Sequence, residues 1–281
     1  IIGIMKKEVI YSMSRQLKHL LLAMCICVFG FIMTGCGAAV STNVRITSST
    51  KANCTISVGY DDELLSAIAD MSDTTKAAII KDMKKSGAKY SKKKIDGVVY
   101  NMFYSTVKNA KLSQVEALLT QCGYTNVCVN SNYFYASFNP DAISNTTAKT
   151  AATGKDLDLT DSMSFYMSAK MTFKTKVAAT NGKLTKDKKT VSWVIKDASK
   201  KKNFYASTNK VIKTAKASSV SNGKSYKAGK KLTVANAKSL AKLTLDGKTI
   251  KSGKTVTKKG THTLMVWSKN GKVQKVTFKI K

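Results

Sequence analysis

Residues 163–173 alternate strictly between apolar and more polar side chains over eleven positions. The apolar positions are Met163, Phe165, Met167, Ala169, Met171 and Phe173. Successive side chains of a β-strand point to opposite faces of a sheet, so this alternation predicts a strand with one buried face. A chain that contains such a strand has to build a sheet and cover one side of it with further apolar residues.

Further strand signals lie on both sides of this segment. Runs rich in Val, Ile, Tyr and Phe predict strands over 44–48, 54–60, 98–107, 190–195 and 203–207. Asp96-Gly97 and Asn181-Gly182 are dipeptides typical of two-residue hairpin turns. We therefore expect a hairpin at each of these two positions.

Helix signals occur between the strands. A short helix is expected after Asp61 or Asp62, and a second over 73–86. A third begins at Ser113, which forms a capping box with Glu116, and ends before Gly123. Strands that enclose several helices predict an α+β domain over 36–207.

The C-terminal part is predicted to be all β. Short strands are expected over 224–227, 231–235, 241–245, 255–257, 261–268 and 273–280, with turns at Asp246-Gly247 and Asn270-Gly271. This spacing predicts a small β-sandwich over 223–281. Residues 208–222 lack aromatics and strong periodicity, and we expect them to be a linker.

Charge is distributed unevenly along the chain. The formal net charge is +32, and residues 181–281 contribute 27 basic against 3 acidic residues. All but two of the basic residues are Lys, which supplies diffuse charge, whereas Arg reads phosphates and bases bidentately. The partners that fit are anionic lipid headgroups, teichoic-acid-type polymers or acidic glycans, and nucleic acid is disfavoured. A solvated lysine surface without a partner is the alternative.

The N-terminal segment has the pattern of an export signal. After Arg15 and Lys18 comes an apolar run over 20–33, which spans roughly 21 Å as a helix and is too short for a bilayer core of about 30 Å. The following Thr34-Gly35-Cys36 resembles the lipobox of bacterial lipoproteins. That resemblance implies a signal peptide over 1–35, cleavage between Gly35 and Cys36, and an acylated Cys36. The protein would then be anchored on the extracytoplasmic face of the cell membrane by its acyl chains.

The chemistry of the remaining residues argues against an enzyme. The chain has two histidines and no nucleotide-binding, zinc or hydrolase motif, so we expect no metal, no cofactor and no catalytic residues. Beyond Cys36 the thiols are Cys54, Cys122 and Cys128. A Cys122–Cys128 disulfide and a set of buried thiols are both compatible with this number.

Two resemblances cover most of the chain. The strand pair after Cys36, the helices, the Asp96-Gly97-x-x-Tyr100 strand start and the Thr-Asn-Gly-Lys segment leading to Trp193 resemble the LppM-type lipoprotein domain. That resemblance implies an α+β surface domain over 36–207 for which lipid or glycolipid binding has been proposed. The turns and strands of 223–281 resemble bacterial Ig-like modules, which are spacers or binding domains.

Together these features predict a lipid-anchored, non-catalytic binding protein at the cell surface. Its ligand would be a lipid or glycolipid, or an anionic polymer of the envelope. The candidate lining of a lipid pocket is Met163, Phe165, Met167, Met171 and Phe173, whose alternative role is an ordinary core face. A structural or adhesive surface protein that contacts proteins or host glycans is the competing hypothesis, and the oligomeric state is open.

Overall fold

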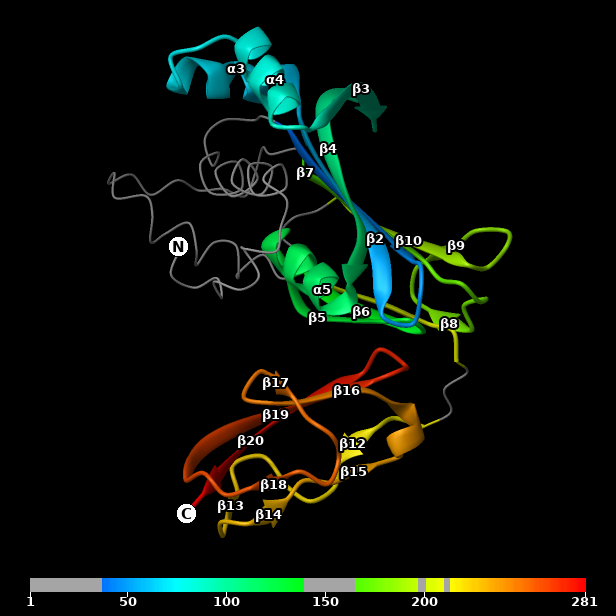
Figure 1. Ribbon diagram of the computed structural model, residues 1–281, viewed down its shortest axis with the longest axis vertical. Helices are drawn as coiled ribbons and strands as arrows, with labels where there is room; N and C mark the ends of the chain where they lie inside the picture. The colour runs from blue at the N-terminus through cyan, green and yellow to red at the C-terminus, as the bar shows by residue number, and fades with distance from the viewer. Residues whose placement is uncertain (1–36, 139–164, 197–200, 210–212) are drawn as a thin grey trace. The chain divides into compact units, whose positions relative to one another are not determined.

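The computed structural model describes residues 37–138, 165–196, 201–209 and 213–281, without the side chains of Met71 and Phe165 (Figure 1). Within these residues the protein is rich in β-strands and has three α-helices. It divides into two compact units. The described part of the first comprises 37–127, 137–138, 165–172, 192–196 and 201–202; the second comprises 128–136, 173–191, 203–209 and 213–281.

A seven-stranded sheet contains the long strands, in the order β3-β4-β2-β1-β7-β10-β9. These strands are β1 Ala38–Ile46, β2 Lys51–Tyr60, β3 Lys89–Ile95, β4 Val98–Lys111, β7 Phe165–Thr172, β9 Lys183–Leu184 and β10 Thr190–Ile195. Neighbours from β3 to β1 are antiparallel, whereas β1 and β7 are parallel. The strands expected over 44–48, 54–60, 98–107 and 190–195 are confirmed. The first begins and ends earlier than expected, and the second and third are longer than expected.

Strand β7 confirms the alternation that predicted it. Met167, Ala169 and Met171 are buried, whereas Lys170 is exposed. Met167 pairs with Val40 of β1, another buried residue, so the apolar faces of the two strands coincide. The period of two in the sequence thus reports which side of this sheet faces the core.

The first two expected helices are present; the first begins after the predicted cap Asp61, and the second is shorter than the expected range 73–86. Helix α3, Asp62–Met71, is capped by Asp61, whose carboxylate accepts from the Leu64 N–H at 2.8 Å. Helix α4, Lys76–Lys85, is capped by Thr75, which accepts from the Ala78 N–H at 3.2 Å. Figure 1 shows both helices at one end of β2 and β4, close to β3.

Helix α5, Leu112–Gln121, corrects the predicted cap. The helix begins before Ser113, and the Lys111 N–H donates to the Gln114 side-chain oxygen at 2.9 Å. Gln114 therefore takes the role that the sequence assigned to Glu116. The predicted end is confirmed, because Gly123 has φ of 85°, a conformation that glycine adopts without strain.

A four-stranded sheet has the order β5-β6-β11-β8. Its strands are β5 Tyr124–Asn130, β6 Tyr133–Phe138, β8 Ala179–Thr180 and β11 Lys202–Ser207. The expected Asn181-Gly182 hairpin is wrong, because β8 pairs with β11 and β9 belongs to the other sheet. Asn181 instead bonds across to β11, accepting from the Tyr205 N–H at 3.0 Å and donating to the Asn203 carbonyl at 2.7 Å.

Residues 213–281 form a five-stranded sheet and two short strand pairs. The sheet has the order β13-β20-β19-β16-β17, with β13 Ser225–Tyr226, β16 Leu240–Leu245, β17 Lys248–Thr249, β19 Gly260–Ser268 and β20 Val273–Ile280. The pairs are β12 Lys216–Ala217 with β15 Val234–Ala235, and β14 Lys230–Lys231 with β18 Thr255–Val256. A 3₁₀ turn, η1 Ala237–Ser239, precedes β16.

One apolar core joins these strands. It includes Val234 and Val256 from the pairs, Leu232 directly after β14, and Leu243, Leu264, Val266, Val276 and Phe278 from the sheet. Ala215 and Val220 are also buried in it, although they lie in the segment 208–222 that we expected to be a linker. Asp246 and Gly247 both have positive φ, 49° and 78°, as a type I′ hairpin between β16 and β17 requires.

Candidate functional site

The expected lipid-anchor site lies outside the described residues. This applies to Gly35 and Cys36, the cleavage and acylation positions, and to Met163 in the expected pocket lining. In the described part of the chain no helix is long and apolar enough to span a membrane.

The remaining candidate lining residues lie deep in the protein. Met167, Met171 and Phe173 are each at most 2% exposed, and the backbone of Phe165 begins β7. An acyl chain would reach these three side chains only if covering residues moved. Their burial satisfies the requirements of a core face as well as those of a cavity wall.

The three described cysteines are buried thiols, and no disulfide joins them. Burial raises the pKa of the Cys54 thiol to about 12. A thiol with that pKa stays protonated at neutral pH and is a poor nucleophile. Of the two alternatives for Cys122 and Cys128, the structure therefore has the buried thiols and not the disulfide.

Two acidic residues at the start of α3 have structural roles. Asp61 caps the helix, and the Asp62 carboxylate accepts from the Asn101 side-chain N–H at 2.8 Å. That hydrogen bond, together with the nearby Lys92 and Lys76, lowers the pKa of Asp62. Among the described residues no three His, Cys, Asp or Glu side chains are grouped as a metal site would need.

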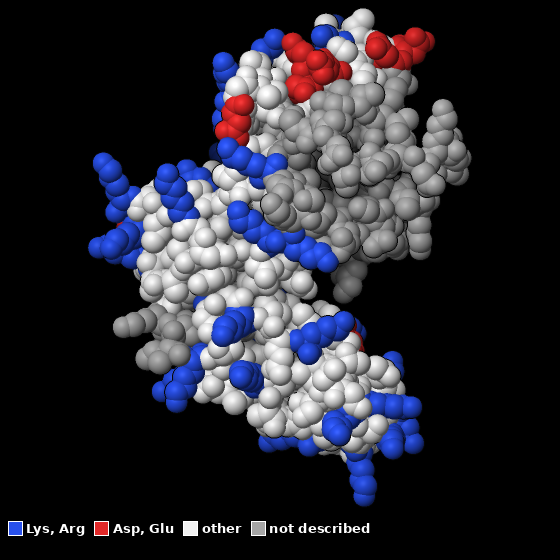
Figure 2. Space-filling model, turned by 180° about the vertical axis from the view of Figure 1, so that it is seen from behind, with Lys and Arg blue, Asp and Glu red and all other residues white. Residues whose placement is uncertain are grey.

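Residues 213–281 have an extreme charge composition. They contain eighteen lysines, and Asp246 is their one acidic residue. Most of these lysines are exposed. Figure 2 shows lysines spread over this part of the surface. Acidic side chains gather instead over the part that holds α3 and α4. Lys230 is held by an aromatic contact, with its Nζ 4.7 Å from the Tyr226 ring centroid.

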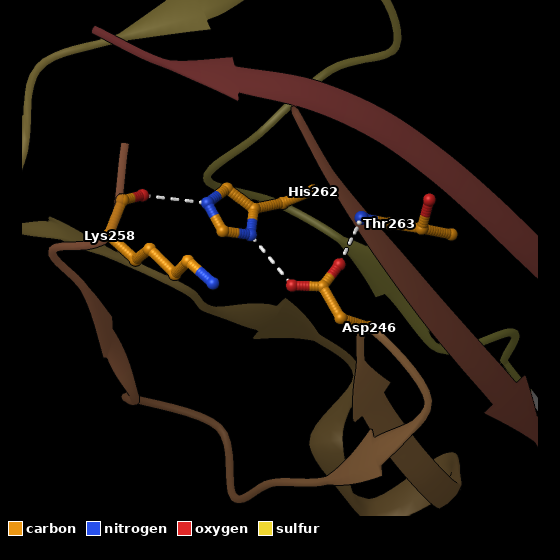
Figure 3. A network of polar contacts seen from close by, with 4 residues as sticks. All are labelled: Asp246, Lys258, His262 and Thr263. Carbon is orange, nitrogen blue, oxygen red and sulfur yellow. Dashed lines mark hydrogen bonds and ion pairs between the residues drawn. The ribbon is translucent and has the colours of Figure 1, made fainter. Parts of the chain in front are cut away.

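Asp246 belongs to a polar network centred on His262 (Figure 3). His262 lies on β19, in phase with the core residues Leu264 and Val266, and is 5% exposed. Its Nδ1 is 2.7 Å from Asp246 Oδ2, and its Nε2 is 2.7 Å from the Lys258 carbonyl oxygen. The Thr263 N–H donates to the other Asp246 oxygen at 2.8 Å. His262 thus joins the β16–β17 turn to the β18–β19 loop.

The pKa values of the two partners move apart. The hydrogen bond to Asp246 raises the pKa of His262 and outweighs the opposing effect of burial. For Asp246, burial alone would raise the pKa, but the hydrogen bonds from His262 and Thr263 lower it overall. Both shifts favour the ionised pair.

The sequence shows His262 only as a lone histidine. The signal that was missed is its phase, because a polar residue at a core position of a strand needs buried partners. Register supplies them: Leu245 pairs with Leu264, which brings the following Asp246 opposite Thr263.

Comparisons with known proteins include a weak structural similarity. No family profile and no curated protein sequence matches the chain. The chain is similar to the folded domain of the Mycobacterium tuberculosis protein LppM, solved by NMR, with 12% identity and a TM-score of 0.36. The match covers 60% of this chain and 87% of that domain. A TM-score at this level does not establish a common fold.

Proposed function

We propose that this protein is a lipid-anchored, non-catalytic binding protein on the extracytoplasmic face of a cell membrane. Its lysine-rich residues 213–281 bind an anionic polymer of the envelope. The proposal includes an acyl anchor on Cys36, an LppM-like α+β domain over 36–207 and an Ig-like sandwich over 223–281. Binding of lipid or glycolipid against the β7 face would be a second contribution of the same protein.

One observation carries the polymer hypothesis. Residues 213–281 set eighteen lysines against a single acid, and both oxygens of that acid are already hydrogen-bonded, to His262 and to the Thr263 N–H. Hardly any of the lysine charge is therefore neutralised within the fold. Within a compact fold, so many like charges repel one another, and a bound polyanion reduces that repulsion.

The residue type indicates the kind of partner. Lysine presents a mobile point charge rather than a bidentate fork, so a lysine surface suits a flexible chain of phosphates or carboxylates more than one shaped ligand. At physiological salt the Debye length is about 8 Å, so only close contacts would contribute. Binding of this kind releases counterions and weakens steeply as salt rises.

A lipid anchor would place this surface in reach of such polymers. Two or three acyl chains hold a protein stably on a membrane, whereas a single chain binds only marginally. Each lysine near an anionic membrane surface adds about 1 kcal/mol, so the same residues would also favour anionic headgroups. Anchor and lysine surface thus act in the same compartment.

The test uses the full-length protein in detergent and inorganic polyphosphate as the probe. A triple variant, Lys231→Gln with Lys251→Gln and Lys254→Gln, removes three exposed lysines at and beside the β14–β18 pair. We expect it to lower the slope of log affinity against log salt by about 2 to 3, roughly one per lost contact.

The matched control removes the same charge from the first unit. Lys89, Lys93 and Lys94 are exposed on the edge strand β3, and their change to Gln should leave polyphosphate affinity nearly unchanged. Equal losses in both triple variants would mean that net charge alone attracts the probe. No binding by the unaltered protein would favour the adhesive alternative, and salt-resistant binding of glycolipid vesicles would move the proposal to the β7 face.

A further inference from the structure

His262 lies between two oxygen atoms that each accept a hydrogen bond. Asp246 Oδ2 and the Lys258 carbonyl oxygen are each 2.7 Å from a ring nitrogen, which is hydrogen-bond distance (Figure 3). A carbonyl oxygen can only accept, so Nε2 must donate to Lys258. The question is then which atom holds the proton between Nδ1 and Asp246.

Asp246 is the acceptor in its contact with His262. Its Oδ1 accepts from the Thr263 N–H at 2.8 Å, and its side chain is 47% exposed, so water also stabilises the carboxylate. With an ionised Asp246, Nδ1 has to donate as well. Only the imidazolium form of histidine donates from both nitrogens, so this geometry belongs to a charged ring.

A neutral ring leaves one of the two contacts without a proton. That nitrogen would present its lone pair to an oxygen lone pair 2.7 Å away, which is repulsive. A hydrogen bond to a carboxylate is about twice as strong as one to a neutral acceptor, so the remaining proton stays on Nδ1. The contact that fails is the one between Nε2 and Lys258.

We propose that His262 is a proton-operated latch: the charged ring holds the β18–β19 loop, residues 257–259, and the neutral ring releases it. The β16–β17 turn stays attached in both states through Asp246. The loop carries two exposed lysines, Lys258 and Lys259, so the latch would also fix part of the polyanion surface. The effect on the polyanion surface rests on the proposed function, whereas the latch itself does not.

The surroundings set the direction of the switch. The charged groups that act on the ring are the Asp246 carboxylate, which favours protonation, and the Lys258 ammonium, which opposes it. From β20 the ring meets Phe278, which is uncharged, at a centroid distance of 5.6 Å. Asp246 prevails, so the latch is closed at mildly acidic pH and opens as pH rises through the pKa of His262.

Nitrogen NMR of the full-length protein in detergent tests the latch directly. Long-range ¹H–¹⁵N spectra distinguish the charged ring from each neutral tautomer, and the signals that a His262→Gln variant loses are those of His262. We expect a ring protonated on both nitrogens at pH 6 and the Nδ1–H tautomer above its pKa. A ring that is neutral at pH 6, or that becomes the Nε2–H tautomer, would overturn the proposal.

Cleavage by a lysine-specific protease reports loop release in the same samples. The rate at Lys258 and Lys259, divided by the rate at Lys248 on β17, should rise several-fold as His262 loses its proton. The ratio cancels the pH dependence of the protease. A His262→Gln variant should give a pH-independent ratio, and a wild-type ratio that stays constant while the ring titrates would disprove loop release. Failure to bind polyphosphate at any pH would contradict the proposed function and leave the latch unaffected.

Discussion

The two compact units each contain a buried polar side chain that joins neighbouring segments, and the two are satisfied differently. Asn101, 1% exposed in the first unit, donates to Asp62 at 2.8 Å and to the Tyr60 carbonyl at 3.3 Å, and accepts from the Tyr90 hydroxyl at 2.8 Å. His262 in the second unit is satisfied only when charged. The amide therefore works at any moderate pH, whereas the imidazole makes its part of the fold sensitive to protons.

The two regions that contain these residues also differ in their balance of charge. Residues 36–180 are nearly balanced in charge, with 17 basic and 12 acidic residues, whereas residues 213–281 have a single acid. In the first region stability should follow apolar burial and neutral hydrogen bonds. In the second it should also follow pH and salt.

The chain offers one reporter for each region. Trp193 lies on β10 and Trp267 on β19, and both are buried. A Trp267→Phe background leaves fluorescence from the first region, and a Trp193→Phe background leaves it from the second. Urea unfolding, followed by tryptophan fluorescence in the matching background, measures the stability of each region.

The largest effect is expected from Met171→Ala in the first region. Met171 is 1% exposed, and truncation of a buried Met to Ala costs about 2–5 kcal/mol of unfolding free energy through lost contacts and the cavity left behind. The loss should be the same at pH 6 and pH 9 and at low and high salt. A loss that added lipid restored would show that the β7 face lines a ligand cavity.

Asn101→Leu should destabilise the first region by about 1–3 kcal/mol, because the Tyr60 carbonyl loses a donor and the Tyr90 hydroxyl loses an acceptor. The loss should again be equal at pH 6 and pH 9. A strong pH dependence here would remove the contrast between the two polar residues.

His262→Gln should destabilise the second region by about 1–2 kcal/mol at pH 6, reduced from the range for charged hydrogen bonds because Asp246 is 47% exposed. The pKa of His262 is raised on folding, so its contribution is complete below about 6.5 and is lost as pH rises through the folded pKa. The difference from wild type should therefore shrink at pH 9.

Asp246 sets the acidic limit of the same network. Its pKa is lowered on folding, so its contribution is present above about 3.9 and disappears as pH falls through the folded pKa. An increasing His262→Gln penalty between pH 6 and pH 9 would contradict the charged-pair interpretation.

The smallest effect concerns repulsion between lysines. The Lys231, Lys251 and Lys254 triple change to Gln should stabilise the second region by a few tenths of a kcal/mol at low salt, because it lowers the positive self-repulsion. The gain should vanish at high salt, where exposed charges are screened. A destabilised variant would indicate that these lysines make specific contacts within the fold.

Local patterns predicted those elements whose signals lie within a few residues. The period of two in 165–173 gave β7, and Asp61, Asp96-Gly97 and Gly123 marked a helix start, a hairpin and a helix end. Strand β3 was missed because four of its seven residues are lysines, which suit an exposed sheet edge but resemble a loop. Strand β6 was missed because all six of its residues are buried, so it shows no alternation.

The His262 network was missed for a different reason. Asp246 and His262 are 16 residues apart, and they meet only through the pairing of β16 with β19. The Lys258 contact uses a backbone carbonyl, which every residue has and which therefore leaves no mark in a sequence. The excess of lysine is visible in the sequence. Only the fold shows that Asp246, the single acid among these residues, is hydrogen-bonded to His262 and to the Thr263 N–H.

Equilibrium binding of inorganic polyphosphate to the full-length protein at 50 and 200 mM salt tests the central claim most directly. A lysine surface that neutralises several phosphates predicts binding at 50 mM salt and an affinity loss of at least about tenfold at 200 mM. Absence of binding at 50 mM salt, or an affinity that does not change with salt, would contradict polyanion binding by residues 213–281.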